Sequence, residues 1–171
     1  QCARVFSEMG VPVISGGAAG VDSTAHEASL RAAGKTVVVL PQGLLTYRGP
    51  QELLHAVEEG RAVLLSEFSP DAQWSTHGAL TRNATIAALS RLVCVIEPGE
   101  SGGSVRTARH ALDQGKCVVV HPRRKNSRVM TGLERAGARR LLGDEGRFSR
   151  ARLLEAWAVE PRSPADQSEM F

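Results

Sequence analysis

Five short apolar runs recur along the chain, and segments that read as helices separate them. The runs cover residues 11–15, 36–40, 62–66, 92–96 and 117–121, and the helical segments between them cover 23–33, 51–59, 79–89 and 104–114. Continuous apolar runs are typical of strands that are covered on both faces. The strict alternation predicts an α/β fold, in which helices lie on both faces of a doubly wound, Rossmann-like and mostly parallel sheet.

The borders of the predicted elements also define the extent of the domain. Gly34, Gly60 and Gly115 each stand where a predicted helix ends before a run. Residues 131–137, 139–142 and 149–158 predict another helix, an edge strand and a last helix. We therefore expect one domain over 1–160 and a flexible tail over 161–171, where Pro, Ser, Asp and Gln are frequent. Residues 2–10 read as the end of a helix, so we expect a first strand to be missing.

Composition excludes several classes of protein. The 171 residues suffice for one domain with a substantial core, and no apolar run reaches the roughly 18 residues that cross a bilayer. We therefore expect a cytoplasmic protein with no membrane partner. Cys2, Cys94 and Cys117 lack CxxC spacing, which favours reduced, buried thiols over a disulfide or a metal site. The net charge of +3 is compatible with an anionic partner.

A glycine-rich stretch, SGGAAG, follows the first run and precedes a predicted helix. Ser15, Gly16, Gly17 and Gly20 form a GxGxxG pattern with serine in the first position, and Asp22 follows in the first helical turn. Glycines let the backbone approach a ligand, and the free N–H groups of a helix N-terminus favour an anion. The alternative is a tight turn that holds nothing. The next run ends without the Asp or Glu that grips a ribose, which argues against a nicotinamide cofactor.

Further candidates lie at the same predicted edge of the sheet. A second glycine-rich corner would place Gly102, Gly103, Ser104 and Thr107 beside a ligand, although two unrelated turns are the alternative. Arg82 and Asn83 offer donors to an anion, and the loop cations Arg123, Arg124 and Lys125 suit phosphates or are simply solvated. The rings of Tyr47 and Trp74 would stack on bases or pack within their loops.

The chain shows no pattern of catalytic residues. Scattered acids, bases and histidines are present, but they form no nucleophile elbow, HExxH or Walker sequence; they are Asp22, His26, Glu67, His77 and Glu97. His26 stands four residues after Asp22, so the two side chains could form a hydrogen bond across one helical turn and brace the loop. We therefore expect no catalytic residues, no metal and no cofactor.

The chain resembles the Rossmann-like domain of the DprA/Smf family over residues 11–138. The motifs that carry this resemblance are SGGAAGVDSTAH, GKTVVVLPQG, LLSEF, TRNATIAALS and VIEPGESGGSVRTARHALDQGK. The resemblance implies binding of single-stranded DNA, loading of the recombinase RecA and pairing of related domains, without catalysis. It places the two glycine-rich corners, with Arg82, Asn83 and Thr107, around an anion pocket.

Two departures from the family leave other functions open. Ala19 and Ala84 stand where the family usually has arginine, and residues 122–132 replace its usual glycine-rich loop. With fewer cations, the same pocket would suit one nucleotide or nucleotide derivative in a sensor domain. A third hypothesis is a phosphoribohydrolase of nucleoside monophosphates that uses Glu97 or Glu67, but the GTxxE pattern of that group is absent.

Overall fold

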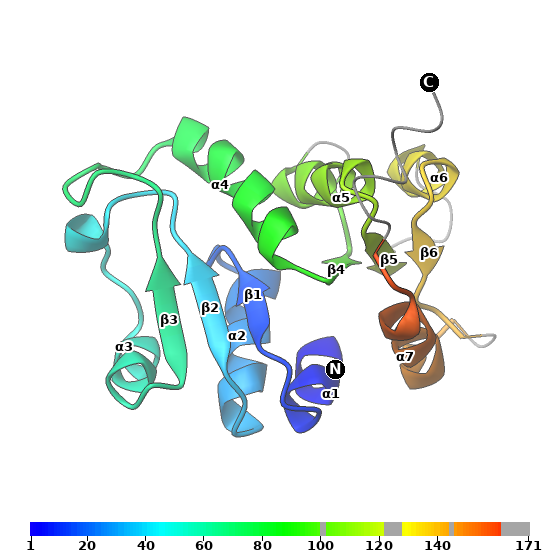
Figure 1. Cartoon of the computed structure of the whole chain (residues 1–171), viewed down its shortest axis with the longest axis horizontal. Helices are drawn as coiled ribbons and strands as arrows, with labels where there is room; N and C mark the ends of the chain where they lie inside the picture. Colours follow the sequence, from blue (N-terminus) through cyan, green and yellow to red (C-terminus); the bar gives the residue numbers. More distant parts are fainter. Residues whose placement is uncertain (100–101, 122–127, 144–145, 162–171) are drawn as a thin grey trace. The chain divides into compact units, whose positions relative to one another are not determined.

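Parallel strands organise the computed structural model, which describes residues 1–99, 102–121, 128–143 and 146–161 (Figure 1). The strands form two three-stranded sheets, in the orders β1-β2-β3 and β4-β5-β6. The chain divides accordingly into two compact units, Gln1–Ile86 and Ala87–Phe171, with the boundary inside helix α4. Each unit is described by itself.

The first unit contains the sheet β1-β2-β3 and the helices that connect its strands. Its elements are α1 (Cys2–Glu8), β1 (Val13–Ser15), α2 (Val21–Arg31), β2 (Thr36–Val39), the 3-10 turn η1 (Leu44–Thr46), α3 (Gln51–Glu58), β3 (Ala62–Leu65) and most of α4 (Thr76–Leu89). Val38 and Leu40 are fully buried, and they form a core with Leu53 and Ala56 of α3. Leu30 of α2 packs against the same core, so both connecting helices cover one face of the sheet.

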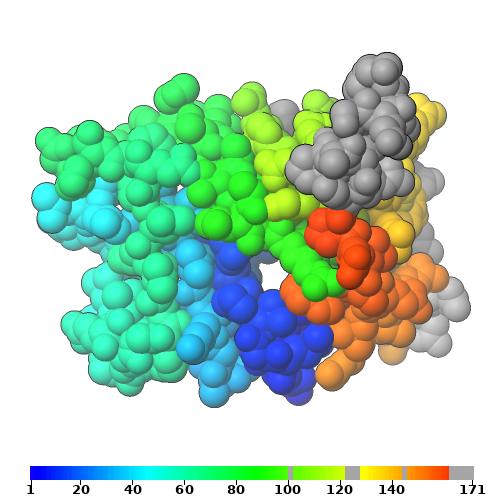
Figure 2. Space-filling model, in the orientation of Figure 1, coloured from blue at the N-terminus to red at the C-terminus, as the bar shows by residue number. Residues whose placement is uncertain are grey.

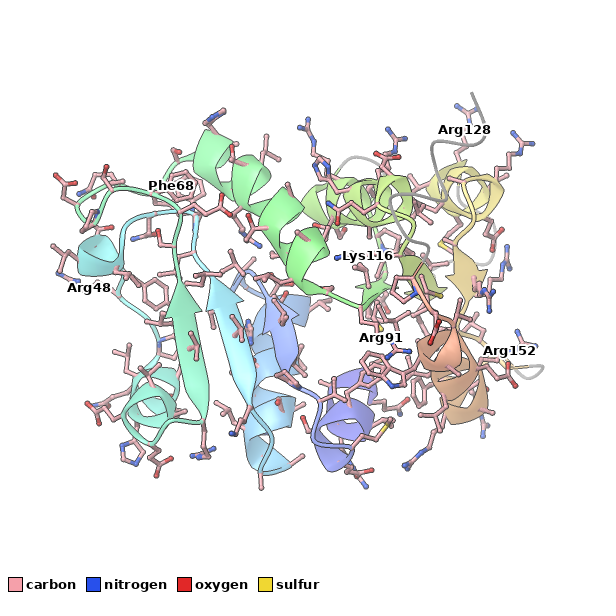
Figure 3. The ribbon with its side chains drawn as sticks, viewed as in Figure 1. Arg48, Phe68, Arg91, Lys116, Arg128 and Arg152 are labelled. Atoms are coloured by element: carbon pink, nitrogen blue, oxygen red, sulfur yellow. The ribbon has the colours of Figure 1, made fainter. Side chains whose placement is uncertain are left out.

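The second unit repeats this arrangement around a second sheet. Its elements are the end of α4, then β4 (Leu92–Ile96), α5 (Gly103–Asp113), β5 (Cys117–His121), α6 (Arg128–Arg135), β6 (Arg139–Arg140) and α7 (Arg150–Ala158). The strands are parallel, and Val93 pairs with Val118 in register. Helix α7 packs near β5, and the Arg91 guanidinium lies 4.8 Å from the ring centre of Trp157 on that helix (Figure 3).

The α/β fold class predicted from the sequence is confirmed, and the bounds of the elements are close to those expected. Strands β4 and β5 have the predicted limits, and the other elements differ by a few residues at their ends. The two strand orders are those of the two halves of a doubly wound sheet. The three cysteines are free and half-buried. Within the described residues, no helix is long and apolar enough to cross a membrane.

The extent of the domain remains a prediction. The boundary between the two units falls inside the predicted domain of residues 1–160. The predicted tail covers residues 161–171, and of these all but Pro161 lie outside the described residues.

Candidate functional site

The SGGAAG stretch forms the connection between β1 and α2, and its backbone requires glycine at two positions. Gly17 and Gly20 have φ angles of 70° and 100°, in the range that residues with a side chain rarely adopt. A β-carbon on Gly17 would also lie 2.9 Å from the side chain of Val38. The sequence therefore folds here into a tight corner that places exposed backbone above the end of the sheet.

The Asp22 carboxylate stabilises this corner through hydrogen bonds to its backbone. One of its carboxylate oxygens accepts hydrogen bonds from the backbone N–H groups of Gly16, at 3.2 Å, and Ala18, at 3.3 Å. Ser23 adds a local bond, because its hydroxyl accepts from the N–H of Gly20 at 3.1 Å. Two of the N–H groups that we expected to face a ligand are thus already bound by the chain itself.

Other N–H groups at the corner remain available to a ligand. Gly17, Ala19 and Val21 are exposed, and their backbone N–H groups make no hydrogen bond to the part of the chain that the structure describes. They lie at the N-terminus of an 11-residue helix, where the helix dipole favours negative charge. The corner therefore retains donors for an anion such as a phosphate.

Arg82 lies beneath this corner and not on the surface. Its side chain comes from α4, and only 7% of the residue is exposed. A β-carbon built on Gly16 would fall 1.4 Å from one terminal nitrogen of Arg82, so the guanidinium occupies the space that Gly16 leaves. Burial lowers the pKa of Arg82, while the nearby Asp22 carboxylate acts in the opposite direction. Arg82 thus supports the loop from below.

The buried side chain of His26 makes a different contact from the one predicted. Its Nδ1 lies 2.6 Å from the Thr36 hydroxyl, which itself donates to the carbonyl of Val13. Because the hydroxyl hydrogen is used in this way, His26 Nδ1 carries the donated proton and Nε2 is left as an acceptor. No bond joins His26 to Asp22 among the hydrogen bonds of the described residues, so the predicted brace across one helical turn is wrong; Asp22 braces the loop through its backbone instead.

The pKa of His26 reflects this burial. Desolvation lowers it, the Asp22 carboxylate raises it, and the Arg82 guanidinium lowers it. The buried Nε2 has no hydrogen-bond partner among the described residues. His26 is therefore held as a neutral imidazole inside the unit.

A cavity that sequence reasoning missed opens beside this corner, between α2 and α3. Its volume is about 470 Å³, and residues from Gly17 to Arg61 line it. Leu30, Leu53 and Pro50 give it apolar walls, and the half-buried ring of Tyr47 also lies along it. Burial raises the pKa of Tyr47, as expected for a phenol packed against a core. Contacts between separate helices form this cavity, so no single sequence motif could have revealed it.

The two aromatic candidates lie in neighbouring loops but differ in exposure. The loop after β2 and the loop after β3 lie side by side (Figure 2), joined by bonds such as Gly43 N–H to Ala72 carbonyl at 2.9 Å. Trp74 is 60% exposed, whereas Tyr47 packs against the core of the first unit. Of the two alternatives weighed for these rings, loop packing describes Tyr47, and Trp74 remains open to a ligand.

The remaining predicted residues are placed as follows. Ser15 is half-buried at the end of β1, and Asn83 is buried in α4. In the second unit, Gly102 is the N-cap of α5 and Ser104 is exposed in its first turn. Thr107 is buried and its hydroxyl donates to the carbonyl of Gly103 at 3.1 Å. The basic residues Arg123, Arg124 and Lys125 lie outside the described residues.

Comparison with known proteins decides the family. The model of the family described as DNA recombination-mediator protein A matches residues 1–144. The chain belongs to this family. A Mycobacterium tuberculosis protein described as a DNA processing protein DprA is similar, with 39% identity over 119 residues that cover 68% of this chain and 30% of that protein. The family predicted from the sequence motifs is thereby confirmed.

Solved DprA structures are also similar to this chain. The X-ray structure of DprA from Streptococcus pneumoniae has a TM-score of 0.69 and 28% identity, covering 86% of this chain and 56% of that one. DprA from Helicobacter pylori, whose structure concerns its single-stranded DNA binding mode, has a TM-score of 0.68 and 29% identity, covering 83% and 66%. The chain thus spans about a third of its curated relatives and under two thirds of these structures.

Proposed function

We propose that this DprA-family chain is a single-stranded DNA-binding module that acts in DNA processing and recombination by binding and not by catalysis. One observation carries the proposal: the backbone N–H groups of the exposed residues Gly17, Ala19 and Val21, which make no hydrogen bond within the described chain, stand at the start of α2 on a corner fixed by Asp22 and Arg82. Such groups suit the phosphates of a DNA backbone. Membership of the family, and the DNA bound by its Helicobacter pylori member, support the choice of ligand.

The proposal extends to further ligands and partners predicted from the sequence. A glycine-rich corner in each unit, around Gly17 and Gly103, would together take successive phosphates, and Trp74 would stack on a base. RecA is the proposed protein partner, a homodimer is the proposed assembly, and the cytoplasm is the proposed location. Support for these comes from the family resemblance alone.

Substitution of Ala19 tests the proposed DNA contact directly. Family members usually carry arginine at this exposed position, so Ala19→Arg adds a phosphate cation and Ala19→Asp adds a repelling charge. Polarisation titrations with labelled oligo(dT) at several salt concentrations should show tighter binding for Ala19→Arg, with a salt slope steeper by about 0.7, and weaker binding for Ala19→Asp.

The control for this test is Ala151, which is exposed on α7. Ala151→Arg adds the same charge to the molecule but lies on an element that contributes no residue to the proposed site. An equal gain from Ala19→Arg and Ala151→Arg would mean that the effect comes from total charge, and absence of binding at low salt would overturn the proposal.

The cavity between α2 and α3 supports a second candidate function, the binding of one nucleotide or nucleotide derivative. A base would lie along Tyr47 and the apolar walls, while its phosphate reached the N–H of Gly17 at the cavity mouth. A mononucleotide should then raise the melting temperature at micromolar concentration. If oligo(dT) stabilises the protein and mononucleotides do not, DNA binding is favoured over this function.

A further inference from the structure

Positive charge is concentrated in the second unit. Of the 21 Lys and Arg residues, 15 lie after Ile86, compared with 10 of the 18 Asp and Glu residues. The first unit therefore carries more acids than bases. Exposed arginines of the second unit lie on its helices α5 and α6.

Helices α5 and α6 share one face of the sheet β4-β5-β6. One buried cluster contains residues of both helices and of the strands β4 and β5. The strand residues are Val93, Val95, Val118 and Val120, the α5 residues are Val105, Ala108 and Ala111, and the α6 residues are Met130 and Leu133. The two helices also contact one another. Their opposite faces consequently point to solvent on the same side of this unit.

Four arginines lie on that outward side. Arg106 and Arg109 are exposed on α5, and Arg128 and Arg135 are exposed on α6. A rise of 1.5 Å per residue separates the first pair by about 4.5 Å and the second by about 10.5 Å along their helices. Figure 3 shows nitrogen-tipped side chains that project from α5 and α6, with Arg128 among them. We call this set the α5–α6 arginine surface.

These four arginines have no hydrogen-bond or ion-pair partner within the described parts of the chain. By contrast, Arg4, Arg31 and Arg61 of the first unit are all paired with glutamates. Of the nearby acids, Glu134 binds Arg140, and Asp113 of α5 is exposed.

The surface also lacks the apolar centre of a protein interface. The large exposed apolar residues of the described chain, such as Leu45, Val63 and Trp74, all lie outside α5 and α6. Protein interfaces are usually depleted of charge at the core and rich in apolar and aromatic groups. A set of exposed arginines with no large exposed apolar residue on the same described helices suits a phosphate backbone, which accepts paired N–H bonds from guanidinium groups.

We propose that the α5–α6 arginine surface is a second contact surface for the phosphate backbone of single-stranded DNA. Arg106 and Arg109 follow Gly103 by three and six residues, so a DNA strand held at that corner would continue over α5 and then α6. This inference rests on the proposed function of the family site. It adds a contact surface on the outer side of the helices, apart from the glycine-rich corners.

The test compares three forms of the full chain. The surface variant carries Gln at Arg106, Arg109, Arg128 and Arg135. The control variant also loses four charges, through Gln at Arg4, Lys35, Arg150 and Arg152, which are exposed basic residues outside the glycine corners, the cavity and the α5–α6 arginine surface. Polarisation of labelled oligo(dT) is measured from low to moderate salt, and the double variants R106Q/R109Q and R128Q/R135Q serve if the fourfold variant melts abnormally.

We expect the surface variant to bind more weakly at low salt and to lose about 2 to 3 from the slope of log K against log salt, because each phosphate contact contributes about 0.7. The control should keep a slope close to that of the unaltered chain. Equal slopes for the surface and control variants would overturn this inference while leaving DNA binding intact.

Two other outcomes would also overturn the inference. If the unaltered chain binds no oligo(dT) at low salt, the proposed function fails as well. If poly-glutamate of equal charge displaces oligo(dT) from the unaltered chain as effectively as unlabelled DNA does, the surface recognises acidic chains in general and not a phosphate backbone.

Discussion

At the scale of single residues, the contact between Gly16 and Arg82 determines the shape of the first corner. Gly16 has an ordinary backbone conformation, so its φ angle does not require glycine. Glycine is required because the Arg82 guanidinium occupies the space where a β-carbon would lie. Gly16→Ala should therefore displace Arg82 and lower the free energy of unfolding by about 1–3 kcal/mol, as overpacking usually does. Urea denaturation of both forms measures the change.

Gly132 is the matched control for that substitution. It lies inside α6, and a β-carbon there would meet nothing within 4 Å. Gly132→Ala should instead stabilise the chain by about 0.5–1 kcal/mol, because alanine favours helix interiors. Equal effects of the two alanines would mean that the Gly16 site has room for a side chain.

His26 should make stability depend on pH. Burial lowers its pKa below the ordinary 6.5, so between the two pKa values the unfolded chain binds more protons than the folded one. Stability therefore falls as the pH drops through 6.5 toward the folded pKa. Urea denaturation at pH 8, 7, 6 and 5 should show a smaller loss for His26→Gln than for the unaltered chain; identical pH profiles would contradict this account of His26.

Some residue roles could not be predicted from sequence because they depend on distant contacts. From the sequence, Arg82 is expected to offer donors to an anion, and only the packing of α4 under the loop shows that it is buried. Gly34 reads as a helix terminator, yet the left-handed residue is Ala33, with φ 55°. A β-carbon on Gly34 would lie 2.4 Å from the Ser7 hydroxyl oxygen, so this glycine serves close packing.

At the scale of elements, Lys116 caps the end of α4 within the second unit. Its ammonium donates to the carbonyls of Ala87, at 2.7 Å, and Ala88, in the last turn of that helix (Figure 3). Cations suit a helix C-terminus, where carbonyls lack partners. Lys116→Met should cost about 1–2 kcal/mol of unfolding free energy, whereas Lys35→Met, at an exposed position, should change it by less than about 0.5. Equal effects would contradict the capping role.

Elements with strong local signals were predicted most closely. Strands β4 and β5 are uniformly apolar and bounded by polar residues, and their predicted limits are correct. Helix α4 begins at Thr76, three residues before its predicted start, because the Ser75 hydroxyl accepts from the N–H of Gly78 and caps the helix. Inside this helix, a β-carbon on Gly78 would lie 2.3 Å from the carbonyl oxygen of Pro41, so there is no space for a side chain at this position.

At the scale of the whole molecule, the sequence motifs identified the family and the fold class, and the structure shows the internal build of each unit. The prediction that the corners at Gly17 and Gly103 converge on one ligand concerns the relation between two units and stays a prediction. The cavity between α2 and α3 and the α5–α6 arginine surface could not be predicted from the sequence, because each joins residues from separate elements.

The central claim is that the backbone N–H groups of Gly17, Ala19 and Val21 at the first corner bind phosphates of single-stranded DNA. Titration of the ¹⁵N-labelled chain with a short oligo(dT), followed by amide chemical shifts, tests this most directly. The account predicts that, within the first unit, the largest saturable shifts occur at Gly17, Ala19 and Val21. Saturable binding that leaves these three amides unchanged would contradict it.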